Sequence, residues 1–168
     1  MGIQPESIVF EDDGSIPNSE LPLLLYRRAF SPDTPDLAAV IEQRFAEYSW
    51  TGSWRAEVFP FHHYHSTSHE VLGVYRGRAT LQLGGENGRR FDVEPGDILV
   101  IPAGVGHKRL ESSPQFHVVG AYPDGRQWDL LRGNPGERPQ ADHNISAVPL
   151  PRNDPLHGSS GPLRQLWK

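Results

Sequence analysis

Short runs of strand-forming residues, separated at close intervals by turn residues, fill the middle of this 168-residue chain. The strand-forming runs cover residues 55–61, 70–76, 78–83, 98–101 and 116–122. Turns rich in glycine, proline, aspartate or asparagine fall at residues 84–88, 94–97 and 102–106. The chain holds 17 glycines and 16 prolines, and short strands divided by such turns are typical of an antiparallel sandwich or small barrel. The sequence therefore predicts an all-β fold.

Residues 1–53, which precede the barrel-like region of residues 54–122, combine two short candidate strands with one helix. The candidate strands cover residues 8–10 and 23–26. A proline and acidic residues at positions 33–36 are typical of a helix start, because negative charge is favourable at that end. Apolar residues then recur every three or four positions, which predicts an amphipathic helix over residues 35–48. Its apolar face contains Leu37, Val40, Ile41, Phe45 and Tyr48.

Residues 123–168 are rich in Pro, Gly, Asn and Arg. They predict a long irregular C-terminal arm, with at most one short helix near residues 126–131. Four apolar residues of the arm could fasten it to the barrel or to a second subunit, namely Trp128, Leu150, Leu163 and Trp167. We expect residues 1–168 to form one domain, because this length suits a single domain.

The composition excludes several kinds of site. The chain has no cysteine, which rules out disulfides, a thiolate nucleophile and cysteine-bound zinc or iron–sulfur clusters. No apolar run approaches about 18 residues, and the polar N-terminus lacks the pattern of a signal peptide. We therefore expect a cytoplasmic protein with no membrane partner. The net charge is −5 and the 16 basic residues are scattered, so we expect no nucleic-acid partner.

Four of the eight histidines lie close together, at His62, His63, His65 and His69. Side chains two positions apart in a strand point to the same face, so His63 and His65 are expected to project into one space. A short Ser/Thr turn follows, and a hairpin there would return Glu70 to the same face. Two imidazoles and a carboxylate that converge in this way form part of a coordination sphere for a divalent transition metal.

A further donor is predicted at His107. This histidine follows the apolar run of residues 98–101, and Pro102 and Gly104 between them would end that strand and turn the chain sharply. His107 would then begin a return strand. It would complete a donor set with the three residues of the hairpin.

Two motifs in this region resemble those of the cupin family. The first reads His63, Tyr64, His65, four residues, Glu70, six residues, Gly77. The second reads Gly96, five residues, Pro102, Ala103, Gly104, two residues, His107. Both occur in the family's order with a fitting gap. The chain resembles the small single-domain bacterial cupins of uncharacterised function that carry His-His-Tyr-His-Ser-Thr before the glutamate.

This resemblance implies a cupin-type double-stranded β-helix, that is, a jelly-roll barrel, to which the N-terminal helix and the C-terminal arm are added. It also implies one divalent transition metal as cofactor, bound by His63, His65, Glu70 and His107. Iron, manganese, nickel and zinc all suit such a donor set. The alternative is a metal-free barrel in which these groups are hydrogen-bonded core residues. The cost of burying a half-satisfied polar set favours the metal.

Three further residues are candidates for positions around the metal or for substrate contacts. Glu57 stands where the family pattern has glycine, and it shares strand parity with His63, so it is expected to face inward. Arg109 shares parity with His107 and would either grip a substrate carboxylate or lie in solvent at the barrel mouth. His69 is expected beside the ligands or at the rim of the pocket. A zinc pair of His65 and His69, which would need a helix over residues 66–70, is the alternative.

The other histidines, and Tyr64, are interpreted as structural or surface residues. His62 and Tyr64 are expected to point away from the ligands, and His117 is expected to be structural. His143 and His157 lie in the arm and are expected at the surface.

The resemblance favours a metal-dependent oxidoreductase of the dioxygenase type that acts on a small oxygen-bearing organic molecule. Two alternatives stay open. One is a cupin that binds or senses a small ligand without catalysis. The other is a cupin sugar isomerase, for which an ionisable group near the metal, such as Glu57, would be needed. Cupins often pair through edge strands, and an open barrel must protect its edges, so we expect a homodimer.

Overall fold

The structure is a computed structural model, and it describes residues 3–168. Its elements in chain order are β1 (Glu6–Phe10), β2 (Ser19–Tyr26), α1 (Leu37–Glu47), β3 (Trp50–Ala56), β4 (Glu70–Arg76), β5 (Ala79–Leu83), β6 (Arg89–Val93), β7 (Ile98–Ile101), β8 (His107–Ser112), β9 (His117–Pro123), α2 (Gln140–Ala147) and α3 (Leu163–Leu166).

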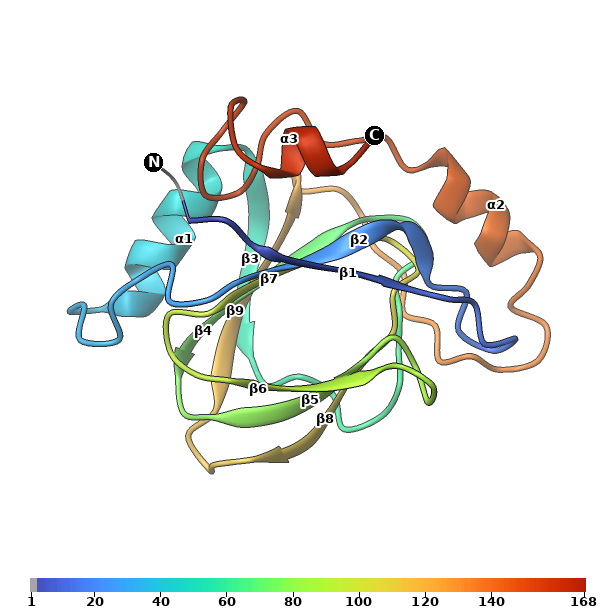
Figure 1. The fold of residues 1–168 in the computed structure, drawn as a ribbon, viewed down its shortest axis with the longest axis horizontal. Coiled ribbons are helices and arrows are strands. Elements are labelled where there is room, and N and C mark those ends of the chain that lie inside the picture. Colours follow the sequence, from blue (N-terminus) through green and yellow to red (C-terminus); the bar gives the residue numbers. More distant parts are fainter. Residues whose placement is uncertain (1–2) are drawn as a thin grey trace.

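Two antiparallel sheets form a jelly-roll barrel, which confirms the predicted fold class. The larger sheet has the strand order β1-β2-β7-β4-β9-β3, and the smaller one has the order β6-β5-β8. Figure 1 looks into the barrel, with the larger sheet above and the smaller sheet below. Strands far apart in the sequence are neighbours in the larger sheet, since β2 pairs with β7 and β4 pairs with β9.

The space between the two sheets holds one hydrophobic core. Alternate residues of each strand point into it, as Leu72 and Val74 do from β4 and Leu99 and Ile101 do from β7. Glu70, at the start of β4, has the same parity as Leu72 and therefore also faces the interior. This alternation is what carries a carboxylate into an otherwise apolar barrel.

The outer face of the larger sheet holds a second core, beneath α1 and the C-terminal arm. The buried members of this core include Ile41 and Phe45 of α1 and Trp167 of the arm. The central strands are therefore covered on both faces, which explains why the run of β7 is apolar without interruption. Gly73 permits the close approach of α1, because a Cβ atom there would lie 2.7 Å from Cγ2 of Ile41.

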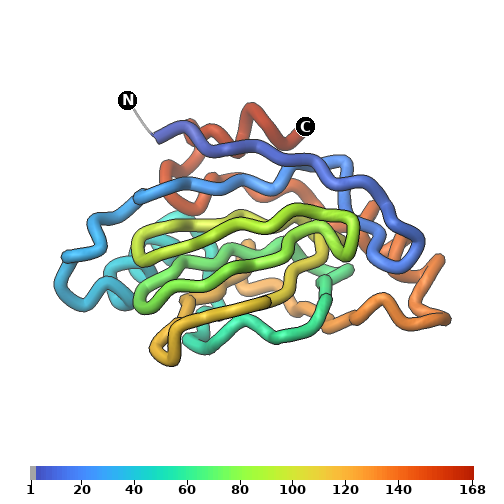
Figure 2. Tube along the Cα trace, turned by 60° about the horizontal axis from the view of Figure 1, so that its bottom comes forward, coloured from blue at the N-terminus to red at the C-terminus, as the bar shows by residue number. Residues whose placement is uncertain are grey.

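The C-terminal arm returns along the N-terminal strands. Figure 2 shows the red end of the chain lying above the blue strands β1 and β2. The indole of Trp167 donates a hydrogen bond to the carbonyl of Pro22 in β2, at 2.8 Å. Leu163 and Trp167 are buried as the anchors of the arm, whereas Trp128 and Leu150 are 43% exposed. Burial thus confirms Leu163 and Trp167 as anchors of the arm.

Several elements differ from their predicted bounds. The strand predicted over residues 55–61 is β3, which ends at Ala56, so residues 57–62 are irregular. β6 was not predicted, because only Phe91 and Val93 of its five residues are apolar and point inward. No helix forms near residues 126–131, and the arm instead contains α2 and α3. His157, expected at the surface, is half-buried against Tyr26.

Among residues 3–168, no helix has the length and apolar character needed to cross a membrane.

Candidate metal centre

Three predicted ligands, His63, His65 and His107, form a buried cluster at one end of the barrel. Each offers one ring nitrogen, and these atoms all lie within 4.8 Å of one another. None of the three residues is more than 5% exposed. His63 does not lie in a regular strand, but its backbone pairs with that of His107 through N–H···O bonds of 3.2 and 2.9 Å. This bridge keeps residues 63–65 extended, so His63 and His65 project to one side as predicted.

The three rings are oriented by backbone carbonyls. The Nδ1 atoms of His63 and His107 lie 3.1 Å from the carbonyl oxygens of Phe61 and Val105. The Nδ1 atom of His65 contacts the carbonyl oxygen of Asp129 in the arm. A carbonyl can only accept, so we assign the proton to Nδ1 in each ring, which leaves the lone pair on Nε2. Such outer contacts are how metal-binding histidines are held in proteins.

Glu70 supplies a carboxylate beside this cluster. Its Oε1 atom lies 3.4 Å from Nε2 of His65 and 3.2 Å from Nε2 of His107. Its Oε2 atom accepts a hydrogen bond of 2.9 Å from the hydroxyl of Tyr122. Burial alone would raise the pKa of Glu70, but the neighbouring His65 and His107 hold it below its ordinary value. The group is therefore an ionised carboxylate in a dry interior.

Burial acts on the imidazoles in the opposite sense. Burial and the proximity of His107 lower the pKa of His63 to about 2, so this ring is neutral. Burial would also lower the pKa of His65, but the Glu70 carboxylate outweighs it and raises the pKa above the ordinary value. The difference shows that the negative charge of Glu70 attracts a positive partner at this position.

The donor set fits a divalent metal. The Nε2 atom of His107 is buried and has no hydrogen-bond partner among the described residues, although Glu70 is near. With the proton on Nδ1, the Nε2 lone pairs of His65 and His107 face a carboxylate oxygen of Glu70. This arrangement is unfavourable unless a cation lies between the nitrogens and the oxygen. Three imidazoles and one carboxylate are also ligands that iron, manganese, nickel and zinc accept.

A cavity of about 320 Å³ opens beside the cluster. Its lining consists of Trp54, Ala56, Glu57, Val58, Phe59, His63, His65, Glu70, Leu72, His107, Tyr122 and Trp128. The four predicted ligands form its polar end, and the rest is mostly aromatic or aliphatic. Burial and the charge of Glu70 raise the pKa of Tyr122 above its ordinary value, so its hydroxyl stays a donor.

Glu57 lines the cavity but lies at its open side. Its side chain is 50% exposed, and its carboxylate lies 4.0 Å from the guanidinium of Arg109. The parity with His63 that placed it inside does not apply, because β3 ends at Ala56 and the following residues are irregular.

Arg109 does not line the cavity. Its Nε donates a hydrogen bond of 2.9 Å to the carbonyl of Val58, and its Nη1 lies 3.3 Å from the hydroxyl of Ser112. The guanidinium is thus used to hold the irregular segment after β3. The pairing of β8 with β5 is regular from His107 to Arg109, so it is the contact with the Val58 carbonyl that turns the guanidinium away from the cavity.

His69 lies on the other face of the larger sheet. Strand alternation sends Glu70 inward and His69 outward, where its ring packs on Trp167 at 4.8 Å between centroids. Its Nδ1 atom accepts a hydrogen bond of 2.9 Å from the backbone N–H of Ala103. Burial lowers the pKa of His69 to about 4. Residues 66–70 form no helix, so His65 and His69 do not come together as a zinc pair.

Tyr64 and His62 point away from the cluster, as expected. Tyr64 is buried with Ile16 and Ala141, and its hydroxyl donates to Glu137 at 2.8 Å. His62 lies 2.7 Å from the exposed carboxylate of Glu86.

A segment of the arm, residues 127–131, which we call the strap, contributes to the site in a way that the motifs do not reveal. The backbone of Leu131 pairs with that of Tyr64 through two hydrogen bonds of 2.9 and 3.0 Å. The Asp129 carboxylate accepts a hydrogen bond of 2.6 Å from the N–H of Ser66 and contacts the Ser66 hydroxyl. Trp128 stacks on Tyr122 and forms one wall of the cavity. The aromatic anchor at Trp128 was the one sequence signal for this segment.

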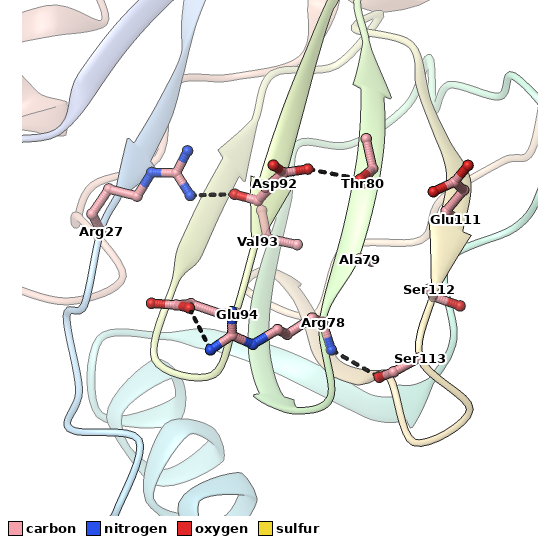
Figure 3. A pocket seen from close by; sticks show the side chains of 10 residues that line it. All are labelled: Arg27, Arg78, Ala79, Thr80, Asp92, Val93, Glu94, Glu111, Ser112 and Ser113. Atoms are coloured by element: carbon pink, nitrogen blue, oxygen red, sulfur yellow. Dashed lines mark hydrogen bonds and ion pairs between the residues drawn. The ribbon is translucent and has the colours of Figure 1, made fainter.

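A second cavity, of about 400 Å³, lies at the other end of the smaller sheet (Figure 3). Its two arginines are already paired, since Arg27 contacts Asp97 at 3.1 Å and Arg78 contacts Glu94 at 3.3 Å. The described residues that line it include no histidine. It therefore offers no donor set comparable with that of the histidine cluster.

Comparisons with known proteins agree with this geometry. Residues 55–111, which contain all four predicted ligands, match the family model described as "Cupin domain". The uncharacterized protein YjlB of Bacillus subtilis (strain 168) is 46% identical over 165 residues, which cover 98% of this chain and 97% of that protein.

Two solved structures show more distant likenesses. Acireductone dioxygenase from Bacillus anthracis, with a cadmium ion in its active centre, has a TM-score of 0.46 and 14% identity over 75% of this chain and 96% of that one. A DUF861 family protein from Thermotoga maritima has a TM-score of 0.33 and 24% identity over 54% of this chain and 92% of that one. Neither likeness bears on activity. The family model and the close relative, together with the barrel and its histidine cluster, show that this chain belongs to the cupin family.

Proposed function

We propose that this cupin binds one divalent transition metal through His63, His65, Glu70 and His107 and acts as a mononuclear, dioxygenase-type enzyme on a small organic molecule. The observation that carries the proposal is the orientation of the three rings. Each Nδ1 atom is held by a backbone carbonyl, so that each Nε2 atom is free to bind a metal at the end of the cavity.

A divalent metal at this position supplies Lewis acidity and, when it is redox-active, reactivity toward O₂. The protein residues around it have distinct tasks. Tyr122 donates to Glu70 and fixes the carboxylate, while the indole N–H of Trp54 donates to the Tyr122 hydroxyl at 2.7 Å. Leu72 and Val58 line the cavity with apolar surface and exclude water from the end where the predicted metal ligands lie.

The sugar isomerase reading has less support. It requires an ionisable group that is buried near the metal without binding it, and Glu57 was the candidate. Glu57 instead lies half-exposed at the open side, beside Arg109. A cupin that binds a ligand without catalysis stays as the alternative, and the experiment below distinguishes it.

Elemental analysis by plasma mass spectrometry tests the metal site. The untagged protein is compared with a His63→Ala, His107→Ala double variant and with His62→Ala, which removes a neighbouring histidine outside the cavity. We expect one metal per chain in the parent and in His62→Ala, and none in the double variant. A parent protein that takes up no metal, even after reconstitution, would contradict the proposal.

Oxygen uptake then tests the enzymatic part. The iron-loaded protein is screened with small oxygen-bearing organic compounds in an oxygen electrode, with the double variant as control. Uptake that depends on both the compound and the ligands supports a dioxygenase. Binding of compounds without any turnover would favour the non-catalytic alternative.

We also propose that the chain forms a homodimer. β1 lies at the edge of the larger sheet, and Val9 on this strand is 59% exposed. An edge strand with an exposed apolar side chain is open to pairing with another chain. Sedimentation equilibrium should give about twice the chain mass of 18.8 kDa, and Val9→Lys should shift the protein toward the monomer. A monomer at micromolar concentration would contradict this proposal.

A further inference from the structure

We infer that the metal cavity takes a small planar aromatic molecule with oxygen donors at one end and no charge on the rest of its body, and that Trp128 determines this preference. The inference rests on the proposed function at the metal end, since the oxygen donors are assigned to the metal. It concerns the aromatic part of the cavity lining, which the predicted metal ligands do not form.

Flat aromatic side chains form the walls of this part. Trp128 stacks on Tyr122 with 5.5 Å between ring centroids and an interplanar angle of 20°, and its ring lies 5.2 Å from that of His65. Trp54 lies against Gly120, where a Cβ atom would be 2.3 Å from the indole ring. Both indoles thus contact Tyr122, Trp128 through its ring face and Trp54 through its N–H. Rigid ring faces favour a planar aromatic ligand, which can stack on them.

The charges of the lining disfavour a carboxylate on the ligand body. Among the described residues that line the cavity there is no lysine or arginine, and the guanidinium of Arg109 is held by the Val58 carbonyl. The lining already carries two carboxylates, Glu57 and Glu70, which would repel a carboxylate on the ligand body. Burial of an anion without a counter-charge is costly.

The hydrogen-bonding groups of the lining disfavour a sugar or another polyol. Apart from the predicted ligands, the polar side-chain groups of the lining are the Tyr122 hydroxyl, the Trp54 indole N–H, the Trp128 indole N–H and the Glu57 carboxylate. The first two already bond to Glu70 and to each other. A polyol would lose its hydrogen bonds to water without replacing them, and unsatisfied buried hydroxyls are unfavourable.

Size and entry agree with this ligand class. A volume of about 320 Å³ is near the lower end of small-molecule sites, which suits one or two rings. Phe59 and Trp128, at the edge of the cavity, are 44% and 43% exposed. Large apolar side chains exposed around an opening are typical of a surface that receives an apolar ligand.

Isothermal titration calorimetry on the zinc-loaded, full-length protein tests the inference, because zinc does not oxidise the probes. The probes are catechol, its carboxylated analogue protocatechuate, and xylose. We expect catechol to bind at least about tenfold more tightly than protocatechuate, and xylose to show no binding. Trp128→Ala should weaken catechol binding about tenfold, whereas Trp128→Phe should retain most of it. Leu130→Ala is the matched control, since Leu130 is an exposed strap residue that does not line the cavity.

The same titrations on metal-free protein, with naphthol and naphthoate, separate this inference from the proposed function. If the chain takes up no metal but still prefers naphthol, and loses this preference in Trp128→Ala, the ligand class holds and the metal function fails. If zinc binds but protocatechuate or xylose binds as well as catechol, the ligand class is wrong and the metal function stands. Catechol binding that is unchanged in Trp128→Ala would likewise overturn the role of Trp128.

Discussion

The hydroxyl of Tyr122 links the wall of the cavity to the predicted metal ligands, because it donates to Glu70 and accepts from Trp54. Tyr122→Phe removes one hydrogen bond from the carboxylate and leaves the Trp54 N–H without its partner. Loss of such a contact to a metal ligand typically costs about 10–100-fold in metal affinity. We expect a loss of this size, measured by competition with a chelator.

Tyr75→Phe is the control for this variant. Tyr75 is half-buried on the outer face of the larger sheet, so its hydroxyl does not touch the site. Equal metal affinities in both variants and the parent would show that Tyr122 does not position Glu70.

Residues that follow a spacing rule were predictable, and residues that depend on a fold-back were not. The four predicted ligands stand at motif positions in adjacent segments, and the structure brings them together. The backbone carbonyl of Asp129 contacts His65, although the two residues are 64 positions apart in the sequence. No local sequence pattern predicts a contact of this kind. Glu57 lines the cavity, but at its exposed side, and the Arg109 guanidinium does not reach the cavity, for a different reason. Strand parity was extended past Ala56, where β3 ends, and it holds only within a regular strand. For Arg109 the pairing is regular, but parity does not fix the direction of a long side chain beyond its first atoms.

At the scale of elements, the strap holds His65 through the backbone carbonyl of Asp129, and the Asp129 carboxylate fastens the strap to Ser66 and Thr67. Asp129→Ala leaves these donors without an acceptor, which should lower the free energy of unfolding by about 2 kcal/mol. Because the carbonyl then loses its fixed position, metal affinity should fall as well. Urea unfolding and chelator competition measure the two effects.

Asp129→Asn keeps one acceptor oxygen and should recover most of the stability. Asp124→Asn removes the charge of an exposed carboxylate of the same arm, whose contact with Arg152 is 3.5 Å long, and keeps a residue that tolerates the positive φ there, so it should change neither quantity. A loss of stability with unchanged metal affinity would show that the strap does not orient His65.

The end of the arm is fastened to β2 by a buried pair. The Tyr26 hydroxyl donates to Asp154, and both residues are fully buried. Asp154 also accepts from the N–H groups of Leu156 and Leu163, at 2.8 and 3.1 Å, which organises the turn before α3. One carboxylate therefore joins a strand, a loop and a helix.

This pair predicts a loss of stability in alkali. Burial and the charge of Asp154 raise the pKa of Tyr26 above its ordinary value. In the unfolded chain the Tyr26 phenol ionises at about pH 10, whereas in the folded protein it stays protonated at that pH. Its contribution to the free energy of unfolding is therefore complete below about pH 10 and is lost as the pH rises further. Unfolding free energies at about pH 8 and about pH 11 should differ less in Tyr26→Phe than in the parent. The pKa values of Tyr64 and Tyr122 are raised as well, so the variant should reduce the difference without abolishing it.

Tyr75→Phe again serves as the control and should keep the pH dependence of the parent. If Tyr26→Phe also keeps it in full, the buried phenol is not its source.

The three helices show when sequence periodicity is enough to predict a helix and when it is not. α1 was predictable because its apolar positions repeat over three turns and cover the sheet. α2 and α3 were not, since each is short and contributes one buried residue, Ala141 or Leu163. Their positions depend on contacts with distant segments, and short helices have little stability of their own.

For the whole molecule, the metal should act as a cross-link between separate parts of the chain. His63 and His65 precede β4, Glu70 begins it, and His107 begins β8 in the other sheet. A ligand that binds only the folded state, at about a thousandfold its dissociation constant, adds about 4 kcal/mol. For a chain of this size we expect the melting temperature to rise by about 10 °C on metal binding.

Differential scanning calorimetry with metal and with a chelator measures this shift. The His63→Ala, His107→Ala variant should melt at one temperature under both conditions. If the melting temperature of the parent protein is the same with metal and with chelator, the two sheets do not share a metal. That residues 1–168 unfold as one unit stays a prediction, which the same scan tests through the number of its transitions.

The family match ends at residue 111, whereas the wall of the cavity at Trp128 comes from the strap. In the site that we propose, the metal ligands and the wall that selects the ligand are thus encoded in different stretches of the gene. Substitutions in the strap could then change which compounds are accepted while the four ligand codons stay untouched. Exchanging residues 127–131 between related proteins, with Asp129 kept, should transfer ligand preference without altering the metal that is bound.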